Sequence, residues 1–363
     1  MDEYKVADTM NETDRKCPSC GGTMDFDPAT GDLGCPYCGW HEAVEPEEET
    51  KSAAELRFED AENYENCDWG AEKKTVVCKS CGAETVYDAL EIAGECPYCG
   101  SNQVMEAQDA KTIAPGGVVP FKITKKQAGE KFIKWIKGRL FTPRKAKKQA
   151  KPDAFKGIYL PYWTFDTDTH STYTARYGID VHYKDRNGNV RTRTHWHFTS
   201  GMYDKFINDQ LARATDRHDT DLLSKIATFD TESNVEYRPE YLAGYASERY
   251  SIGLKDAWEN DAKKAIRRGL EYEIDRHIRL TRHADHVAGL MIKTNYNDIT
   301  FKYLLLPIWV SSFKYKDKVY GFVVNGQNGH VGGRAPISAL RVAIAAILGV
   351  TAIGLLWYLF SHM

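Results

Sequence analysis

One four-cysteine unit occurs twice in the chain. The segment CPSCGGTMDFDPATGDLGCPYCG, residues 17–39, is matched by CKSCGAETVYDALEIAGECPYCG, residues 78–100. Each unit has a Cys-x-x-Cys pair, a gap of fourteen residues and a second pair within Cys-Pro-Tyr-Cys-Gly. Two such turns, each relaxed by the glycine that follows it, bring four thiolates into the closed tetrahedron of a structural Zn²⁺ site. The repeat therefore predicts two zinc ribbons.

Eight of the nine cysteines are the predicted metal ligands, and the predicted cofactor is Zn²⁺, two structural ions per chain. A rubredoxin-like iron site, which has a wider gap between its pairs, and a redox Cys-x-x-Cys are the alternatives. Cys67 belongs to no pair and is read as a plain thiol. The first ion would be held by Cys17, Cys20, Cys35 and Cys38, and the second by Cys78, Cys81, Cys96 and Cys99.

The beginning of the chain favours metal over disulfides. Its first residues, MDEYKVADTMNETDRKC, are acidic and polar and contain no apolar core, so we expect no signal peptide. A chain made in the cytosol keeps its thiols reduced, and regular cysteine pairs in that compartment are typical of metal sites.

The net charge of −3 hides a strong asymmetry. Residues 1–110 contain 26 acidic and 8 basic residues, whereas the rest contains 25 acidic and 40 basic ones. Zinc ribbons often bind nucleic acid, but a phosphate backbone requires cations, and each four-thiolate site adds about two negative charges. Within the acidic linker, SAAE at residues 52–55 is typical of a capping box and predicts a short helix with Leu56 and Phe58.

The last apolar segment, VAIAAILGVTAIGLLWYLF at Val342–Phe360, has no charged residue. Its nineteen residues match the hydrocarbon thickness of about 30 Å at 1.5 Å per residue. The alternative is a buried core helix, which is rarely apolar on every face. Because Arg334 and Arg341 precede the segment and no Lys or Arg follows it, we expect a single-pass span in the cytoplasmic membrane, with the N-terminal body in the cytoplasm.

Residues 122–156 contain thirteen Lys or Arg against two acidic residues. Thr124 is positioned to cap a helix whose apolar residues keep helical spacing as far as Leu140. A solvated basic face is the plainest interpretation of this segment. Anionic lipid headgroups and nucleic acid are the two alternatives.

An α+β body is predicted for the middle of the chain. IYLPYWTFD at 158–166 is echoed by LLLPIWVSSF at 304–313, so we expect a duplicated antiparallel β unit, with strands at 161–177, 179–184, 190–198, 304–315 and 318–325. Turns are expected at KDRNGN, NGQNGH and GHVGG. Residues 254–280 predict a long amphipathic helix between the two units. The expected organisation is an acidic tail (1–15), ribbon 1 (16–41), an acidic linker (42–76), ribbon 2 (77–104), a basic helical segment (105–157), the body (158–336) and a transmembrane helix (342–360).

No catalytic residues are visible in the sequence. His195 and His197 would share a strand face, and His283 and His286 a helix turn, but neither pair belongs to a known metal motif. The sequence also lacks a Gly-x-x-x-x-Gly-Lys-Ser/Thr loop, so we expect no enzymatic activity and no nucleotide hydrolysis.

In their order along the chain, these motifs resemble one bacterial family. The doubled ribbons, GIYLPYWTFD, YLAGYASERYSIGLKDAW, YLLLPIWVSSFKYKDKVYGFVVNGQNGHVGG and the apolar end are similar to membrane-anchored transcription-factor-IIB-type zinc-ribbon proteins. Members are often labelled primosomal replication helicases, a label that the missing helicase motifs do not support. The resemblance implies an association with phage-shock protein A-like and stomatin-like membrane proteins, and a role in envelope stress or membrane maintenance.

Two functions follow as hypotheses. The first is a non-enzymatic membrane-anchored adaptor or scaffold, which recruits protein partners through the ribbons and the body. The second is a nucleic-acid-binding regulator that uses the ribbons or the basic 122–156 segment. The charge distribution favours the adaptor, because the ribbon half is strongly acidic.

Overall fold

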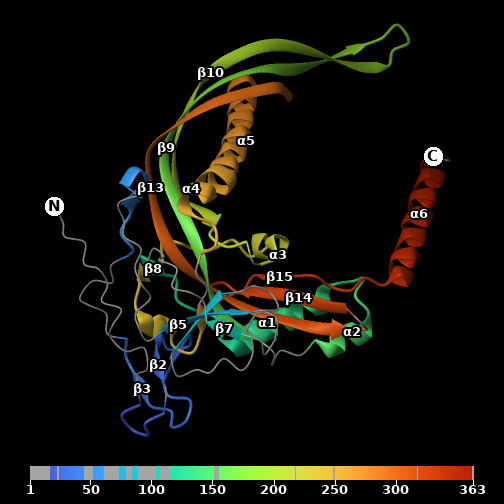
Figure 1. Ribbon diagram of the computed structural model, residues 1–363. Coiled ribbons are helices and arrows are strands. Elements are labelled where there is room, and N and C mark those ends of the chain that lie inside the picture. The colour runs from blue at the N-terminus through green and yellow to red at the C-terminus, as the bar shows by residue number, and fades with distance from the viewer. Residues whose placement is uncertain are drawn as a thin grey trace.

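The computed structural model describes residues 17–22, 24–44, 52–60, 73–78, 84–88, 104–106, 115–150, 155–216, 218–247, 250–316 and 318–361. Within these ranges the chain mixes helices and strands, with a cysteine cluster near the N-terminus and one apolar helix at the C-terminal end, as expected for the α+β class (Figure 1). The helices are α1 (Lys125–Gly138), α2 (Arg144–Gln149), α3 (Thr220–Ser224), α4 (Leu254–Ala257), α5 (Lys263–Arg282) and α6 (Ala339–Ser361).

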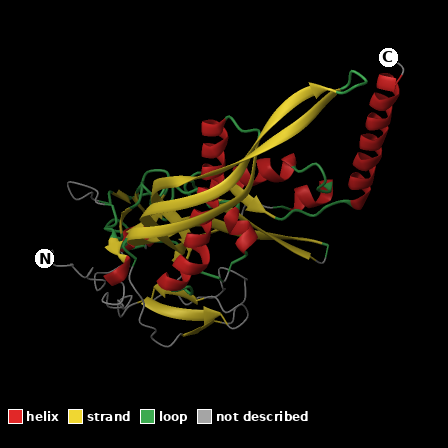
Figure 2. Cartoon of the chain, turned by 90° about the horizontal axis from the view of Figure 1, so that it is seen from above, coloured by secondary structure: helices red, strands yellow, loops and turns green. Residues whose placement is uncertain are grey.

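The strands form two sheets. The first has three strands in the order β1 (Asp25–Asp27), β2 (Asp32–Gly34) and β3 (His41–Glu42). The second is a twelve-stranded sheet dominated by a few long strands, which curve away from the rest of the body as an arm (Figures 1 and 2). Its strands are β4 (Leu56–Arg57), β5 (Lys73–Cys78), β6 (Glu84–Asp88), β7 (Val104–Glu106), β8 (Gly117–Val118), β9 (Lys156–Lys184), β10 (Val190–Arg213), β11 (Val235–Glu236), β12 (Ala246–Ser247), β13 (His286–Tyr315), β14 (Lys318–Asn325) and β15 (Val331–Gly333).

Two antiparallel hairpins make the centre of the large sheet. β9 pairs with β10, β13 pairs with β14, and the first strands of the two hairpins pair antiparallel with each other. In this central ladder Leu160 lies opposite Leu306, the two leucines that precede proline in the echoed motifs. The motifs therefore meet at equivalent positions about a local two-fold axis.

Backbone hydrogen bonds at the two prolines follow the same correspondence. The carbonyl of Pro161 accepts from the N–H of Ala214, just after β10, at 3.3 Å, and the carbonyl of Pro307 accepts from Gly326, just after β14, at 2.8 Å. Short parallel strands lie at matching places too. β12 pairs with β9 at residues 158–159, and β8 pairs with β13 at residues 304–305, in each case one and two positions before the leucine. This pattern is what a duplicated β unit would produce.

The helices cover the hairpins crosswise. α1, which precedes the first hairpin, packs on the second, because the ring of Phe132 stacks on Phe322 of β14 with centroids 3.6 Å apart. α5, which precedes the second hairpin, lies against the arm formed by β9, β10 and β13, where Tyr203 of β10 donates to Glu273 (Figure 1). α1 thus covers the second hairpin, and α5 covers the arm that the first hairpin forms together with β13.

The two long helical segments of the body, which begin at Lys125 and Leu254, start where the sequence predicts. Thr124 caps α1 in a full capping box with Gln127, which satisfies two backbone N–H groups of the first turn. The second helical segment runs from Leu254 to Arg282, but a π turn (η4, Trp258–Ala262) divides it into α4 and α5. Every fourth residue along it is buried: Leu254, Trp258, Ala262, Ile266, Leu270, Ile274 and Ile278.

Four strand boundaries differ from the expectation, and the first is the start of β9, which lies at Lys156 and not at residue 161. Residues 161–184 form one strand without a break at Gly178, where a Cβ atom would lie 2.6 Å from Thr194. Glycine there allows close packing and does not interrupt the strand. β10 continues to Arg213 and β13 begins at His286, because the arm extends both ladders far beyond the apolar motifs.

Other local expectations were wrong. No helix begins at SAAE: residues 52–55 are irregular, the N–H of Ala53 donates to Asn234, and Leu56 pairs with Phe301 in the sheet. Within GHVGG, residues 331–333 are strand β15. His283 ends α5 in a left-handed conformation and His286 opens β13, so the two do not share a helix turn.

Candidate metal centre

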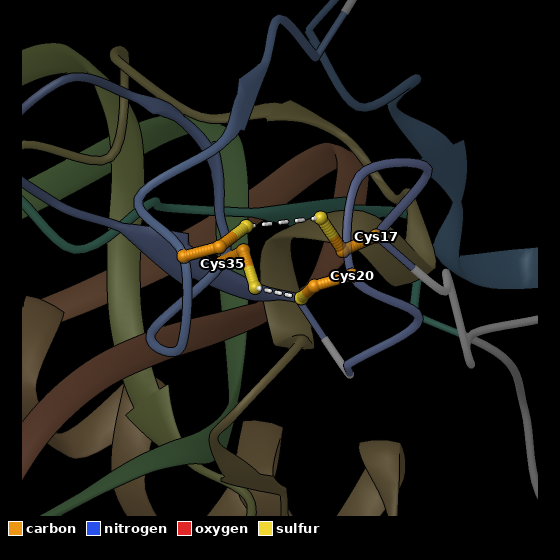
Figure 3. A group of neighbouring side chains, drawn as sticks. Cys17, Cys20 and Cys35 are labelled. Carbon is orange, nitrogen blue, oxygen red and sulfur yellow. Dashed lines mark hydrogen bonds between the residues drawn. The ribbon is translucent and has the colours of Figure 1, made fainter.

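Four thiols converge at the first cysteine unit. The Sγ atoms of Cys17, Cys20, Cys35 and Cys38 all lie within 4.8 Å of one another. Cys17 and Cys38 are 3.5 Å apart, as are Cys20 and Cys35 (Figure 3). A disulfide would require about 2.05 Å. Thiolates around Zn²⁺ at about 2.3 Å are separated by roughly 3.8 Å, so the cluster has the dimensions of a tetrahedral zinc site.

The first Cys-x-x-Cys turn is closed by two backbone hydrogen bonds. The N–H of Gly21 donates to the carbonyl of Cys17 at 2.8 Å, and the N–H of Cys17 donates to Gly22 at 2.7 Å. Gly21 has φ +73°, a conformation that side chains with a Cβ rarely adopt. The glycine after the pair is therefore required by the backbone and not by lack of space.

The second turn repeats this geometry. The N–H of Gly39 donates to Cys35 at 3.0 Å, and the N–H of Cys35 donates to Trp40 at 2.7 Å. Gly39 has φ +74°, close to the value in the first turn. In each turn the first cysteine is buried and the second is exposed. A metal ion would therefore be held from opposite sides by two equivalent turns.

The backbone also sets the acidity of the thiols. The N–H of Trp40, helped by Cys17, lowers the pKa of Cys38 to about 7. The N–H of Gly22 acts in the same direction on Cys20, but hydrogen bonds with Cys35 and Cys38 raise the pKa of that thiol to about 12. One thiol of the cluster thus ionises near neutral pH, and thiolate is the form that binds metal.

The three-stranded sheet attaches this unit to the body. Phe26 of β1 donates its N–H to the carbonyl of Ala243 at 3.1 Å, and the hydroxyl of Tyr245 donates to the carbonyl of Phe26 at 3.2 Å. The ring of Phe26 also meets Tyr241 edge-on, with centroids 5.4 Å apart. Backbone and aromatic contacts together fix the cysteine unit on the segment before β12.

The second cysteine set falls largely outside the described residues. Cys78 ends β5, and nothing is described of its side chain. Cys81, Cys96 and Cys99 lie outside the described ranges, as does Cys67. Strands β5, β6 and β7 around this unit pair with one another and join the large sheet through β12. The second zinc site stays a prediction.

The histidines are engaged in separate local contacts. His197 stacks on Tyr177 across β9 and β10, and His286 lies 3.0 Å from a carboxylate oxygen of Asp180. Across the described ranges, only the four-cysteine cluster brings three or more potential ligands together. His195 and His197 lie two positions apart on β10 and share a strand face, as the alternation predicts.

A buried charge network was not foreseen from the sequence. Lys302, only 8% exposed, reaches carboxylate oxygens of Glu55 at 3.0 Å and Asp209 at 2.6 Å. Asp166 accepts the N–H of Asp209 at 2.6 Å. The signal was present in FKYLLLP, where one lysine interrupts an apolar strand and must find partners when buried.

Burial controls the protonation of this network. Desolvation, with Glu55 as a further cause, raises the pKa of Asp166 to about 6, against the opposing hydrogen bond from Asp209. Burial also acts on Glu55, but hydrogen bonds with Asp166 and Lys302 lower the pKa of that carboxyl. Asp166 therefore takes up a proton before Glu55 as pH falls.

α6 is unlike the other helices. Its side chains are exposed on every face, and residues Ala339–Leu359 are long and apolar enough to cross a membrane. Figures 1 and 2 show the helix standing apart from the sheets. A core helix of a soluble protein would bury such a surface.

Comparisons with known proteins give one relative and no function. The chain is 29% identical over 334 residues to a protein described as "Uncharacterized protein YdjG" from Bacillus subtilis (strain 168). The alignment covers 90% of this chain and 91% of that protein. No protein-family model matches the chain, and no solved structure matches it. The similarity extends over most of both chains and assigns no activity.

Proposed function

We propose that this protein is a non-enzymatic adaptor of the cytoplasmic membrane. In this proposal the cysteine units hold two structural zinc ions, α6 spans the bilayer, and the body recruits protein partners on the cytoplasmic side. The proposal is carried by one combination: a closed four-thiol cluster packed on a folded body that ends in a fully exposed apolar helix.

The thiol cluster supports a structural role for the metal. All four ligand positions of a tetrahedral zinc ion are supplied by cysteines, which leaves no coordination position for a substrate or a water. The ion would link the two cysteine turns and keep the sheet of β1, β2 and β3 packed against the body. Envelope stress and partners like phage-shock protein A or stomatin rest on the family resemblance alone.

The membrane span is supported by the exposure of α6. Ile353 and Trp357 are 69% and 73% exposed, and a helix with such side chains on all faces is unstable in water but suited to lipid. Arg334 and Arg341 lie at its N-terminal side, which favours a cytoplasmic body.

Exposed aromatic side chains near the second cysteine turn offer a test of partner recruitment. Tyr37 and Trp40 are 77% and 47% exposed, and the contacts that Trp40 makes with the cluster come from its backbone. Replacing both by serine should leave the metal content unchanged while removing apolar surface that a protein partner would bury.

The experiment is affinity capture of the full chain from detergent-solubilised membranes. Proteins recovered with the wild type should be depleted with Tyr37→Ser/Trp40→Ser at unchanged zinc content. The matched control is Tyr272→Ser/Leu280→Ser on the exposed face of α5, which should recover them normally. An identical set of proteins from all three chains, or none from the wild type, would count against recruitment through the ribbon.

A further inference from the structure

The connection between α1 and α2 is fastened to the beginning of α6. The N–H of Ser338 donates to the carbonyl of Phe141 at 2.9 Å. The guanidinium of Arg341 donates to the carbonyls of Leu140 and Thr142, each at 2.9 Å. Arg341 lies 201 positions after Leu140 and 199 positions after Thr142 in the sequence. Residues 140–142 and the first turn of α6 nevertheless form one hydrogen-bonded unit.

This junction exposes several apolar side chains. Leu140 is 79% exposed, and Ile337 and Leu340 are 72% and 71% exposed beside it. Phe141 is also exposed. Because the hydrogen bonds hold these residues next to the first turn of α6, they lie where α6 would enter a bilayer.

A dense group of cations follows on α2. Arg144, Lys145, Lys147 and Lys148 occupy four of its six positions, and the helix contains no acidic residue. Within the part of the chain that the structure describes, none of the four forms an ion pair. Lys147 donates to the backbone carbonyl of Lys137, which leaves its charge uncompensated. Among the described residues, therefore, no acidic side chain neutralises these four positive charges.

We infer that residues 139–148, together with Ile337 and Leu340, form a lipid platform that docks on anionic headgroups of the bilayer. The inference rests on the proposed function, since it takes α6 as the span. Leu140 and Phe141 would enter the interfacial region, and the cations of α2 would lie over the headgroups. Each cation near an anionic surface is worth about a fivefold gain in partition, and salt screens the attraction.

The platform would fix the orientation of the body relative to the bilayer, which α6 alone cannot do. A helix anchor leaves the body free to rotate and tilt about the connection, whereas a second contact fixes one face of the body toward the bilayer. The hydrogen bonds of Arg341 transmit this restraint directly, because they join the platform to the span. Partner surfaces on the body would then be presented at a set height above the membrane.

The test separates the platform from the span by using the full chain with α6 disabled. In Leu348→Arg/Ile353→Arg, two charges at the helix centre prevent insertion. Flotation with vesicles of phosphatidylcholine, with and without 30% phosphatidylglycerol, measures the remaining affinity. We expect at least tenfold stronger binding to the anionic vesicles, abolished by 0.5 M NaCl.

Charge neutralisation then locates the contact. On the same background, Arg144→Gln/Lys145→Gln/Lys148→Gln should lose at least tenfold in binding to anionic vesicles. The matched control removes three exposed cations elsewhere, Lys264→Gln/Arg268→Gln/Lys318→Gln, and should lose less than threefold. Leu140→Ser should weaken binding to both kinds of vesicle at low salt, because its contribution is apolar.

Equal binding to neutral and anionic vesicles would overturn the inference, and so would equal losses of binding in the two triple variants. The inference would also fail if the same three cations bound a DNA duplex more tightly than anionic vesicles at the same salt concentration. Failure of the proposed function would give a different result in the flotation experiment. In that case the wild-type chain, with α6 intact, would not insert into neutral vesicles, whatever the anionic vesicles show.

Discussion

Trp163 and Trp309 make the same hydrogen bond from the two halves of the sheet. The indole N–H of Trp163 donates to the carbonyl of Ile252 at 3.0 Å, and that of Trp309 donates to Ile123 at 2.8 Å. Each acceptor immediately precedes the N-cap of a helix from the other half of the chain. The two bonds therefore join the halves reciprocally, at positions related by the local two-fold axis.

The aromatic neighbours of the two tryptophans correspond as well. Trp163 packs on Tyr250 with ring centroids 5.2 Å apart, and Trp309 packs on Phe121 at 5.0 Å. Tyr250 and Phe121 both lie two residues before the accepting isoleucine. Each tryptophan thus contacts an aromatic ring and a carbonyl at corresponding positions of the two halves.

The first prediction is that Trp163→Phe and Trp309→Phe destabilise the fold by similar amounts. Each change leaves a carbonyl at a helix entrance without its donor, which costs about 1–3 kcal/mol. Urea unfolding followed by circular dichroism measures the difference. Trp196→Phe, whose ring is exposed on the arm, is the control and should change stability by less than about 0.5 kcal/mol. A large loss in only one of the two core variants would contradict the correspondence.

The sequence shows which residues begin the β units but not how they pair. The two Leu-Pro motifs are visible as local patterns, and their strands were predicted on that basis. The crosswise packing of α1 and α5 depends on contacts between residues far apart in sequence: 186 positions separate Trp309 from Ile123, and 70 separate Tyr203 from Glu273. No local pattern encodes such a pairing.

Local helix propensity also gave a wrong prediction where a distant residue forms a hydrogen bond with the backbone. SAAE has the composition of a helix start, but the N–H of Ala53 is occupied by Asn234, 181 residues away. The four-thiol cluster was predictable because its turns are local, each closed within six residues by its own glycine. The Lys302 network was not, because its partners come from three separate segments of the chain.

The second prediction concerns zinc. Purified protein should contain close to two zinc ions per chain, and Cys17→Ser should lower that number by about one, since a three-thiolate site binds far more weakly. Elemental analysis after gel filtration gives the count. Cys67→Ser is the matched control and should leave it unchanged. Iron as the main metal would refute the ribbon assignment.

The third prediction is that Asp166 makes stability depend on pH. Burial raises its pKa from the ordinary value of 3.8 to about 6, so its ionised form is disfavoured in the folded state. The penalty is absent below pH 3.8, grows between the two values and is complete above pH 6. Asp166→Asn mimics the protonated form and can keep the hydrogen bond from Asp209.

The variant should therefore gain stability relative to the wild type as pH rises from 5 to 8, by on the order of 1 kcal/mol. Urea unfolding at several pH values measures this difference. Glu55, Asp209 and Lys302 face the same group and are unchanged in the comparison. Asp168→Asn, on an exposed position of the same strand, should show no such trend. A constant difference across the range would rule out Asp166 as the titrating group.

The fourth prediction is that α6 holds the protein in the membrane. An arginine at the centre of a span costs about 2.5–3.5 kcal/mol on insertion scales, so Leu348→Arg/Ile353→Arg should move the chain from the membrane pellet to the soluble fraction. Carbonate washing should not release the wild type, because apolar burial and not ion pairing retains it. Tyr272→Arg/Leu280→Arg adds the same two charges to the exposed face of α5 and should leave the protein in the pellet.

Truncation provides the complementary measurement. A chain ending at Ser338 lacks α6 but keeps the cations of α2, so the lipid platform should give it only weak, salt-sensitive membrane association. The truncation also removes Arg341 and its bonds to Leu140 and Thr142, so the N–H of Ser338 to the carbonyl of Phe141 is the bond that remains at this junction. Complete retention of the truncated chain after a high-salt wash would show that α6 is not the anchor. The body would then have to be held by an integral membrane partner.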